Sequence, residues 1–263
     1  MHTFRFGEQA ALIAMLAAGP ACAGIRIQIA RGHPIIDGIY VNGHGPYRFM
    51  VDTGATLNHL DLAMAQSIGL KPTFRTELTA SSGTAIVTGA SGIRVTVDTL
   101  QADEQTFLFA GLDVVHRVHP DVQGVLGEEF LSRFDYLLDL RGKRIEFGKQ
   151  ELEEAKTRVP FQTITGRPVV PTSLGNLVLD SGASLLTLFG VQAAAVTREL
   201  ITMTGSVKVG MVASKLIIDG RMFWHGRAVT IPHSAESGAT GLLPVSLFKA
   251  VYVCNSEQYM VFN

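Results

Sequence analysis

The tetrapeptides Asp52-Thr53-Gly54-Ala55 and Asp180-Ser181-Gly182-Ala183 are two versions of one short motif, 128 residues apart. Each follows an apolar run that is typical of a β-strand, at residues 47–51 and 176–179. Tripeptides of this kind are also common in ordinary turns, so a single copy carries little information. Two copies in the same context indicate an internal duplication of the chain.

The sequence around the two motifs repeats as well. Upstream, Gly32-His33-Pro34-Ile35-Ile36 corresponds to Gly166-Arg167-Pro168-Val169-Val170. Downstream, Gly124-Val125-Leu126-Gly127 corresponds to Gly241-Leu242-Leu243-Pro244. Matching segments in the same order predict two similar lobes rather than a chance recurrence.

The duplication also predicts how the chain is divided. Residues 24–150 form the first lobe and residues 159–263 the second, with the boundary near the charged stretch at residues 149–158. Each predicted lobe has the size of an ordinary small domain with its own core. Residues 1–23 are assigned to a separate N-terminal segment.

Composition predicts an all-β fold. Apolar residues make up 47% of the chain and charged residues 17%, and the 27 glycines separate many short apolar runs. This pattern is typical of short strands joined by turns. We expect only a few short helices, at residues 62–68, 128–134 and 191–201.

Two similar lobes would bring Asp52 and Asp180 face to face. Like charges at close range cannot both ionise cheaply, so one carboxyl keeps a proton while the other is charged. Such a pair can act as base and acid on a water molecule and a peptide carbonyl at the same time. Gly54 and Gly182 would let each loop approach the opposite carboxyl, because glycine has no Cβ. The alternative is that each Asp simply stabilises its own turn.

The repeated motifs resemble those of the aspartic peptidases of the retropepsin and pepsin superfamily, and most closely those of the bacterial retropepsin-like group. The resemblance extends from about Ile25 to Asn263. It implies two β-barrel-like lobes related by duplication, with Asp52 and Asp180 as the catalytic pair that holds the attacking water. A shared proton is the recognised property of such pairs in aspartic proteases.

The resemblance also assigns supporting roles. Six residues would shape the two active-site loops, with the Thr and Ser hydroxyls bonded across the interface: Thr53, Gly54, Ala55, Ser181, Gly182 and Ala183. A hairpin flap from each lobe would close over substrate, involving Ser82 and Gly83 in the first lobe and Gly205 in the second. Pro244 departs from the family pattern, because the family has a glycine where Pro244 stands.

Two functions remain open. The first is an endopeptidase that cleaves a peptide or protein substrate as a monomer, since one chain supplies both motifs. The second is a catalytically inactive, retropepsin-like peptide-binding protein. No cofactor and no metal is expected, because His116 and His119 lie in a proline-containing loop without nearby cysteines. A net charge of −1 without a basic stripe argues against nucleic acid as a partner.

The N-terminus is typical of a signal peptide. Arg5 precedes an apolar run at residues 10–18, and Ala21-Cys22-Ala23 would permit cleavage before Gly24. Export to a bacterial periplasm or the exterior is therefore expected. Cleavage would leave Cys254 as the sole cysteine, so that a disulfide within the monomer is excluded. No apolar span is long enough for a transmembrane helix.

Overall fold

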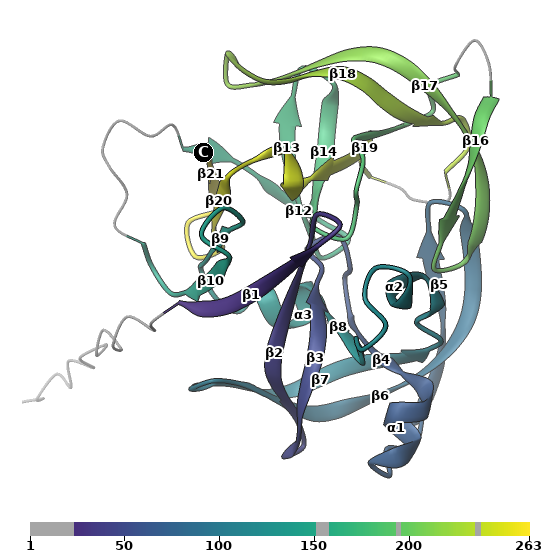
Figure 1. The fold of residues 1–263 in the computed structure, drawn as a ribbon, viewed down its shortest axis with the longest axis vertical. Helices are drawn as coiled ribbons and strands as arrows, with labels where there is room; N and C mark the ends of the chain where they lie inside the picture. Colours follow the sequence, from purple (N-terminus) through teal and green to yellow (C-terminus); the bar gives the residue numbers. More distant parts are fainter. Residues whose placement is uncertain (1–23, 151–157, 193–195, 235–237) are drawn as a thin grey trace, which may run out of the picture.

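The structure, a computed structural model, describes residues 24–150, 158–192, 196–234 and 238–263. The predicted all-β fold is confirmed: two similar lobes built from strands and a few short helices lie one above the other in Figure 1. The predicted signal peptide at residues 1–23 lies outside the described residues. Within the described ranges, no helix is long and apolar enough to cross a membrane.

The elements follow the chain in the same order in both lobes. Lobe 1 contains β1 (Ile25–Ala30), β2 (His33–Val41), β3 (His44–Val51), β4 (Asn58–Asp61), α1 (Leu62–Ser67), β5 (Phe74–Ala80), β6 (Gly83–Val97), β7 (Leu100–Ala110), α2 (Asp113–His116), β8 (Gly124–Leu126), α3 (Glu128–Leu131), β9 (Tyr136–Asp139) and β10 (Arg144–Phe147). Lobe 2 contains β11 (Val159–Pro160), β12 (Gln162–Ile164), β13 (Arg167–Thr172), β14 (Gly175–Asp180), β15 (Thr187–Phe189), β16 (Val196–Thr202), β17 (Gly205–Ile218), β18 (Arg221–Ile231), β19 (Gly241–Pro244), the 3-10 helix η1 (Val245–Leu247), β20 (Ala250–Cys254) and β21 (Tyr259–Phe262).

Both Asp motifs lie at the end of a strand that has the same neighbours in each lobe. In lobe 1, β3 runs parallel to β8, with Val51 opposite Leu126, and β8 runs antiparallel to β4. In lobe 2, β14 runs parallel to β19, with Leu179 opposite Leu243, and β19 runs antiparallel to β15. The duplicated sequence therefore builds the same support behind each Asp.

The two lobes share a sheet. Its strand order begins β11-β21-β20-β9-β10-β1 and continues through β2 into lobe 1. In this part, β20 and β21 of lobe 2 lie next to β9 and β10 of lobe 1. The contact between lobes is the antiparallel pair β9–β20, in which Leu138 lies opposite Val251. These strands lie together on the left of Figure 1.

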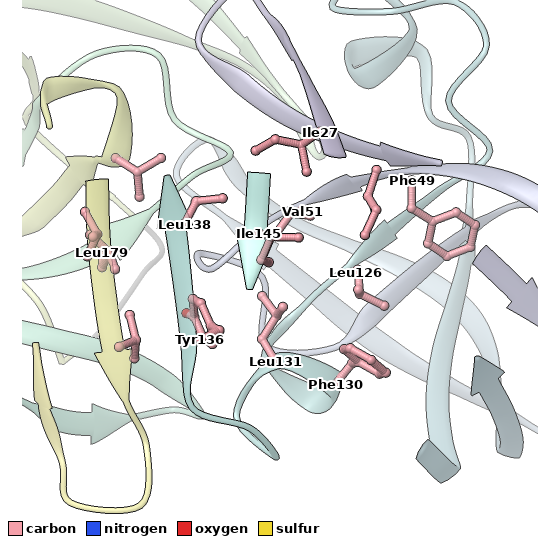
Figure 2. Close-up of a cluster of buried hydrophobic side chains, with 14 of the residues drawn as sticks. Ile27, Phe49, Val51, Leu126, Phe130, Leu131, Tyr136, Leu138, Ile145 and Leu179 are labelled. Carbon is pink, nitrogen blue, oxygen red and sulfur yellow. The ribbon is translucent and has the colours of Figure 1, made fainter. Parts of the chain in front are cut away.

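A single apolar core extends across this junction. Figure 2 shows side chains from β1, β3, β8, α3, β9 and β10 packed together with Leu179 of lobe 2. Val51, Leu126 and Leu131 in this cluster are fully buried. Because Val51 and Leu179 directly precede the two Asp motifs, the core fixes the strand ends from which both loops start.

Two of the three predicted helices are confirmed and one is wrong. Residues 62–67 form α1, whose Asp61 side chain accepts hydrogen bonds from the Ala63 and Met64 N–H groups, and α3 is shorter than the predicted 128–134. Residues 196–202, which overlap the third predicted helix at residues 191–201, form the strand β16 instead. There Ile201 and Thr202 pair with β17, and β-branched residues of this kind favour strands once a partner strand is present.

The division into lobes at residues 149–158 stays a prediction. Most of that stretch, residues 151–157, lies outside the described residues. The flanking elements β10 and β11 both belong to the shared sheet.

Candidate active site

Backbone hydrogen bonds fix the Asp52 loop. The Asp52 N–H donates to the Leu126 carbonyl (2.9 Å), which ties the start of the first loop to β8. The Gly54 N–H donates to Asp52 Oδ1 (2.9 Å), which holds the carboxyl of Asp52 over its own turn. Asp52 is partly exposed and Asp180 is 8% exposed.

Four hydrogen bonds join the loops across the lobe interface. The Thr53 hydroxyl donates to the Leu179 carbonyl (2.7 Å) and accepts from the Ser181 N–H (3.0 Å). The Ser181 hydroxyl donates to the Val51 carbonyl (2.7 Å) and accepts from the Thr53 N–H (3.0 Å). Thr53 and Ser181 are both fully buried. The predicted role of the two hydroxyls is therefore matched by the geometry, and the loops are locked in one relative position.

Each carboxyl lies against the glycine of the opposite loop. A Cβ placed on Gly54 would collide with the carboxyl of Asp180, and a Cβ placed on Gly182 would collide with the carboxyl of Asp52. No side chain larger than hydrogen fits at either position without moving the Asp opposite. The sequence prediction that Asp52 and Asp180 come together thus agrees with their placement.

Burial raises the pKa of Asp52. The hydrogen bond from Gly54, the charge of His33, and hydrogen bonds from Asp180 and Gly182 oppose that rise. A carboxyl that accepts a hydrogen bond from a second carboxyl is one half of a pair with a shared proton. The electrostatics of the site are those of a coupled acid and base.

Ala55 and Ala183 follow the two glycines, as predicted. The Ala55 N–H donates to the Asp52 carbonyl (3.2 Å), and its carbonyl accepts from the Glu128 N–H (2.8 Å). Ala183 is partly exposed in the matching place of lobe 2. Neither side chain can donate a hydrogen bond to the neighbouring carboxyl.

Pro244 fits its position despite the departure from the family pattern. In lobe 1, Gly127 has an ordinary negative φ of −98°, and its N–H donates to Asn58 Oδ1 (2.9 Å). In lobe 2, Pro244 has φ −65°, and the residue that corresponds to Asn58 is Leu186. Proline has no N–H to donate and leucine has no acceptor to satisfy. The donor and the acceptor of lobe 1 are thus replaced together.

A second ring of contacts joins each Asp loop to a hairpin of the other lobe. The Thr56 hydroxyl donates to the Thr165 carbonyl (2.8 Å), in the turn between β12 and β13. At the matching place, His33 Nδ1 lies 3.1 Å from the Ser181 carbonyl and Nε2 lies 2.8 Å from Ser184 Oγ. Thr56 and Ser184 are each the fourth residue after their Asp.

The two predicted flaps meet at their tips. Flap 1 is the β5–β6 hairpin and flap 2 is the β16–β17 hairpin, and Figure 1 shows them on the same side of the molecule. Ser82 Oγ lies 2.5 Å from Thr202 Oγ1 and 2.7 Å from Thr204 Oγ1, and Thr204 Oγ1 donates to the Gly83 carbonyl (3.1 Å). Gly83 and Gly205 occupy matching turn positions, with φ 144° and 139°.

Flap 2 also reaches the apolar side of lobe 1. Met203 packs against a cluster that includes Ala55, which directly follows the first motif. We name the buried members of this cluster the lobe 1 apolar cluster: Ile35, Met50, Leu112, Val115, Val122 and Val125. An apolar surface therefore lies beside Asp52 and beneath the tip of flap 2.

Sequence reasoning missed the residues whose contacts cross between lobes. His33, Ser184 and Met203 each act on residues far away in the chain. The repeated Gly-His-Pro and Gly-Arg-Pro segments were a signal for His33, since they mark equivalent turns. No local pattern indicated Met203, because an apolar residue in a hairpin turn is most simply a surface residue.

Other features lie apart from the carboxylate pair. A hollow of about 510 Å³ on lobe 1 is lined by Tyr47, Asp61 and His116 among others, and none of the motif residues lines it. His116 Nε2 lies 2.9 Å from the Val122 carbonyl. Within the described part of the chain, no three His, Cys, Asp or Glu residues are grouped as metal ligands.

Residues 38–133 match the sequence family described as "gag-polyprotein putative aspartyl protease". This match, which includes the first motif, confirms the resemblance to retropepsin-like aspartyl proteases. Comparison with curated protein sequences gave no significant match.

Two solved structures are similar to this chain. Basic 7S globulin from soybean is 9% identical, with 91% of this chain and 94% of that chain covered and a TM-score of 0.55. A retropepsin-like aspartic protease from Rickettsia conorii is 22% identical, with 48% of this chain and 89% of that chain covered and a TM-score of 0.37. The soybean structure shows that the fold extends over both lobes of this chain.

Proposed function

We propose, from the premise that this chain carries a retropepsin-like aspartyl protease lobe over residues 38–133, that it is an aspartic endopeptidase. The observation that carries the proposal is the reciprocal placement of the two Asp loops. Each carboxyl lies against the glycine of the opposite loop, and the Thr53 and Ser181 hydroxyls hold the loops in that arrangement.

The proposed mechanism uses the carboxylate pair, Asp52 and Asp180, with a water molecule between them. The ionised carboxyl removes a proton from the water as it attacks the peptide carbonyl carbon, while the protonated carboxyl gives its proton to the carbonyl oxygen. The tetrahedral intermediate then breaks its C–N bond as one carboxyl donates a proton to the amide nitrogen and the other takes a proton back from a hydroxyl of the intermediate, which returns the pair to its starting state. The enzyme forms no covalent bond with the substrate in this scheme.

The surroundings of the pair support an extended peptide as substrate. Ala55 and Met203, which are partly buried and pack against the lobe 1 apolar cluster, would contact an apolar side chain of the substrate next to Asp52, and the two flaps would cover the backbone of the peptide. Burial of an apolar side chain there would contribute about 1.5–3 kcal/mol to binding.

Substitution of either carboxyl tests the proposal. Asp52→Asn and Asp180→Asn keep the size of the side chain but cannot share a proton, so we expect each to lower peptide hydrolysis at least ~100-fold. Asp121→Asn is the matched control, because Asp121 is a lobe 1 aspartate whose side chain is 72% exposed. Hydrolysis of a denatured protein mixture should be measured from acidic to neutral pH, with folding checked by circular dichroism.

Near-normal hydrolysis by either Asn variant would contradict the proposal. The alternative, an inactive peptide-binding protein, predicts that the native chain binds peptides at every pH without cleaving them. Pro244 does not favour the inactive peptide-binding protein, because Leu186 in lobe 2 needs no donor where Asn58 of lobe 1 accepts one from Gly127.

We further propose that the chain is exported. The support is the sequence pattern of residues 1–23, with Arg5 before an apolar run and Ala21-Cys22-Ala23 at its end. Cleavage before Gly24 would leave β1 intact, since β1 begins at Ile25. Expression in a bacterial host, with N-terminal sequencing of the periplasmic and external fractions, should give a chain that begins at Gly24. A chain that stays inside the cell with Met1 retained would contradict export.

A further inference from the structure

His33 belongs to lobe 1 but holds the Asp180 loop of lobe 2. It is 3% exposed and begins β2. Its Nδ1 lies 3.1 Å from the carbonyl of Ser181, the residue next to Asp180, and its Nε2 lies 2.8 Å from Ser184 Oγ. A buried imidazole is thus fixed at both nitrogens by the loop that carries one of the two carboxyls.

The chemistry of the two partners determines what the ring can do. A carbonyl oxygen only accepts, so Nδ1 carries the hydrogen and donates to Ser181. A hydroxyl can donate or accept, so Ser184 can donate to a neutral Nε2 or accept from a protonated Nε2. The ring can therefore gain a proton without losing either hydrogen bond. The contacts with Ser181 and Ser184 therefore hold the ring in the same position in either protonation state.

That charge acts on the carboxylate pair. A positive charge near a carboxyl favours the ionised form and lowers the pKa, and His33 acts on Asp52 in this direction. In lobe 2 the matching residue is Arg167, whose charge is permanent. The two lobes thus place one titratable and one permanent cation at equivalent turns.

We propose that His33 is a positioning residue of the carboxylate pair, which holds the Asp180 loop from the opposite lobe through Ser181 and Ser184 and, when protonated, stabilises the ionised form of the pair. The consequence is an extended acidic range, because protonated His33 keeps one carboxyl ionised at lower pH than burial alone would allow. The predicted effect of His33 on activity rests on the proposed peptidase function.

Other ionisable groups near the pair have distinct effects. Asp52 and Asp180 are the groups on which His33 acts. Glu128 lies behind the first loop, and its charge and that of Asp52 repel each other. Arg31, in the same turn as His33, is exposed, so its charge is largely screened by solvent. Arg167 is unaffected by pH in the working range.

Two substitutions separate the hydrogen bonds of His33 from its charge. His33→Asn keeps a donor near the place of Nδ1, and His33→Gln keeps a polar group near the place of Nε2, but neither can become charged. Ser184→Ala is the matched control, because it removes one hydrogen bond and leaves the imidazole. We expect both His33 variants to move the acidic limb of the kcat/KM profile upward by about half a pH unit or more. Ser184→Ala should lower the rate without moving that limb.

A uniform loss of rate in all three variants, with the acidic limb unmoved, would reduce His33 to a structural residue and overturn the inference. The stability of each variant should be compared by thermal unfolding at the pH of the assay.

A second measurement needs neither activity nor a His33 variant. Because coupling between two sites is reciprocal, loss of the charge on the pair must make His33 release its proton more easily. NMR titration of labelled histidine in the double variant Asp52→Asn with Asp180→Asn, in which the pair carries no charge, should show the His33 ring losing its proton at lower pH than in the native chain. Equal titration in the two proteins would overturn the inference. If the native chain hydrolyses no peptide, the proposed function fails, while this titration still tests His33.

Discussion

Glu128 is a buried carboxyl that lies behind the pair rather than in it. It is 2% exposed, and the Tyr136 hydroxyl donates to its Oε1 (3.3 Å). The pKa of Glu128 is raised to about 8, mainly by burial; the Tyr136 hydrogen bond opposes this rise, and the negative charge of Asp52 contributes to it. At neutral pH the residue is therefore a neutral hydrogen-bonding group beneath the first loop.

The raised pKa of Glu128 predicts a loss of stability in weak alkali. Between about pH 4.5 and about pH 8, the folded chain keeps a proton on Glu128 that the unfolded chain has released. The free energy of unfolding then falls as pH rises through that window, by on the order of 4 kcal/mol in total. Glu128→Gln cannot titrate, so it should match the native chain near pH 4.5 and be more stable at pH 8.

Thermal unfolding of both proteins across that range measures the effect. Glu129→Gln, at the adjacent and partly exposed carboxyl, is the control and should change the pH dependence little. A Glu128→Gln protein that is less stable than the native chain at pH 8 would show that the negative charge, and not the proton, stabilises the loop.

The alanines after the motif glycines predict a mildly acidic pH optimum. Burial raises the pKa of Asp52, and Ala55 and Ala183 have no hydroxyl to stabilise the charged carboxyls. We expect kcat/KM to follow a bell-shaped profile with an optimum at roughly pH 5–6.5. The double variant Ala55→Thr with Ala183→Thr should move the optimum down, because a donated hydrogen bond lowers a carboxyl pKa.

The matched control is Ala55→Val with Ala183→Val, which adds the same bulk without a hydroxyl. An optimum below about pH 3.5 in the native chain, near the ordinary Asp value, would contradict the prediction.

At the scale of elements, the two flaps depend on each other. The hydroxyls of Ser82, Thr202 and Thr204 join the two tips. A hydrogen bond of this kind contributes about 1 kcal/mol, which is small enough for the flaps to separate when substrate enters. The contact would therefore set how often the flaps are closed without preventing them from opening.

Removal of one hydroxyl should loosen both tips. Thr204→Val keeps the shape of the side chain but loses the contacts with Ser82 and the Gly83 carbonyl. We expect backbone amides at residues 81–83 and 203–205 to exchange hydrogen several-fold faster, as about 1 kcal/mol implies. Thr106→Val, which removes a hydroxyl pair with Ser91 away from the tips, is the control. Faster exchange in flap 2 alone would show that the tips move independently.

The sequence could predict those elements whose stabilising contacts are made by residues close together in the chain. It could not predict elements whose contacts come from residues far apart in the chain. The motif loops, α1 and the flap turns follow from residues that are neighbours in the chain, such as Asp61 before α1 or Gly83 and Gly205 in tight turns. The helix expected at residues 191–201 was wrong because β16 is stabilised by pairing with β17, which a local pattern does not contain. The role of His33 was hidden for the same reason, since its partner Ser181 lies 148 residues away.

At the scale of the whole molecule, one chain supplies both halves of the site. The Thr53 and Ser181 hydroxyls, the carboxylate pair and both flaps come from two lobes joined through β9 and β20. We therefore expect activity from a monomer. Sedimentation velocity at assay concentrations, combined with activity measured over a dilution series, should give constant specific activity at monomer mass. Activity that disappears on dilution along with a dimer peak would contradict this prediction.

The shared sheet has a consequence for how the chain is made. During synthesis the strand β9 emerges with one edge open, and its partner β20 follows more than a hundred residues later. An open strand edge is a template for joining a second molecule. A chain truncated before β20 would keep that edge open permanently. Synthesis of β20 is thus also the step that covers this edge and protects the protein from aggregation.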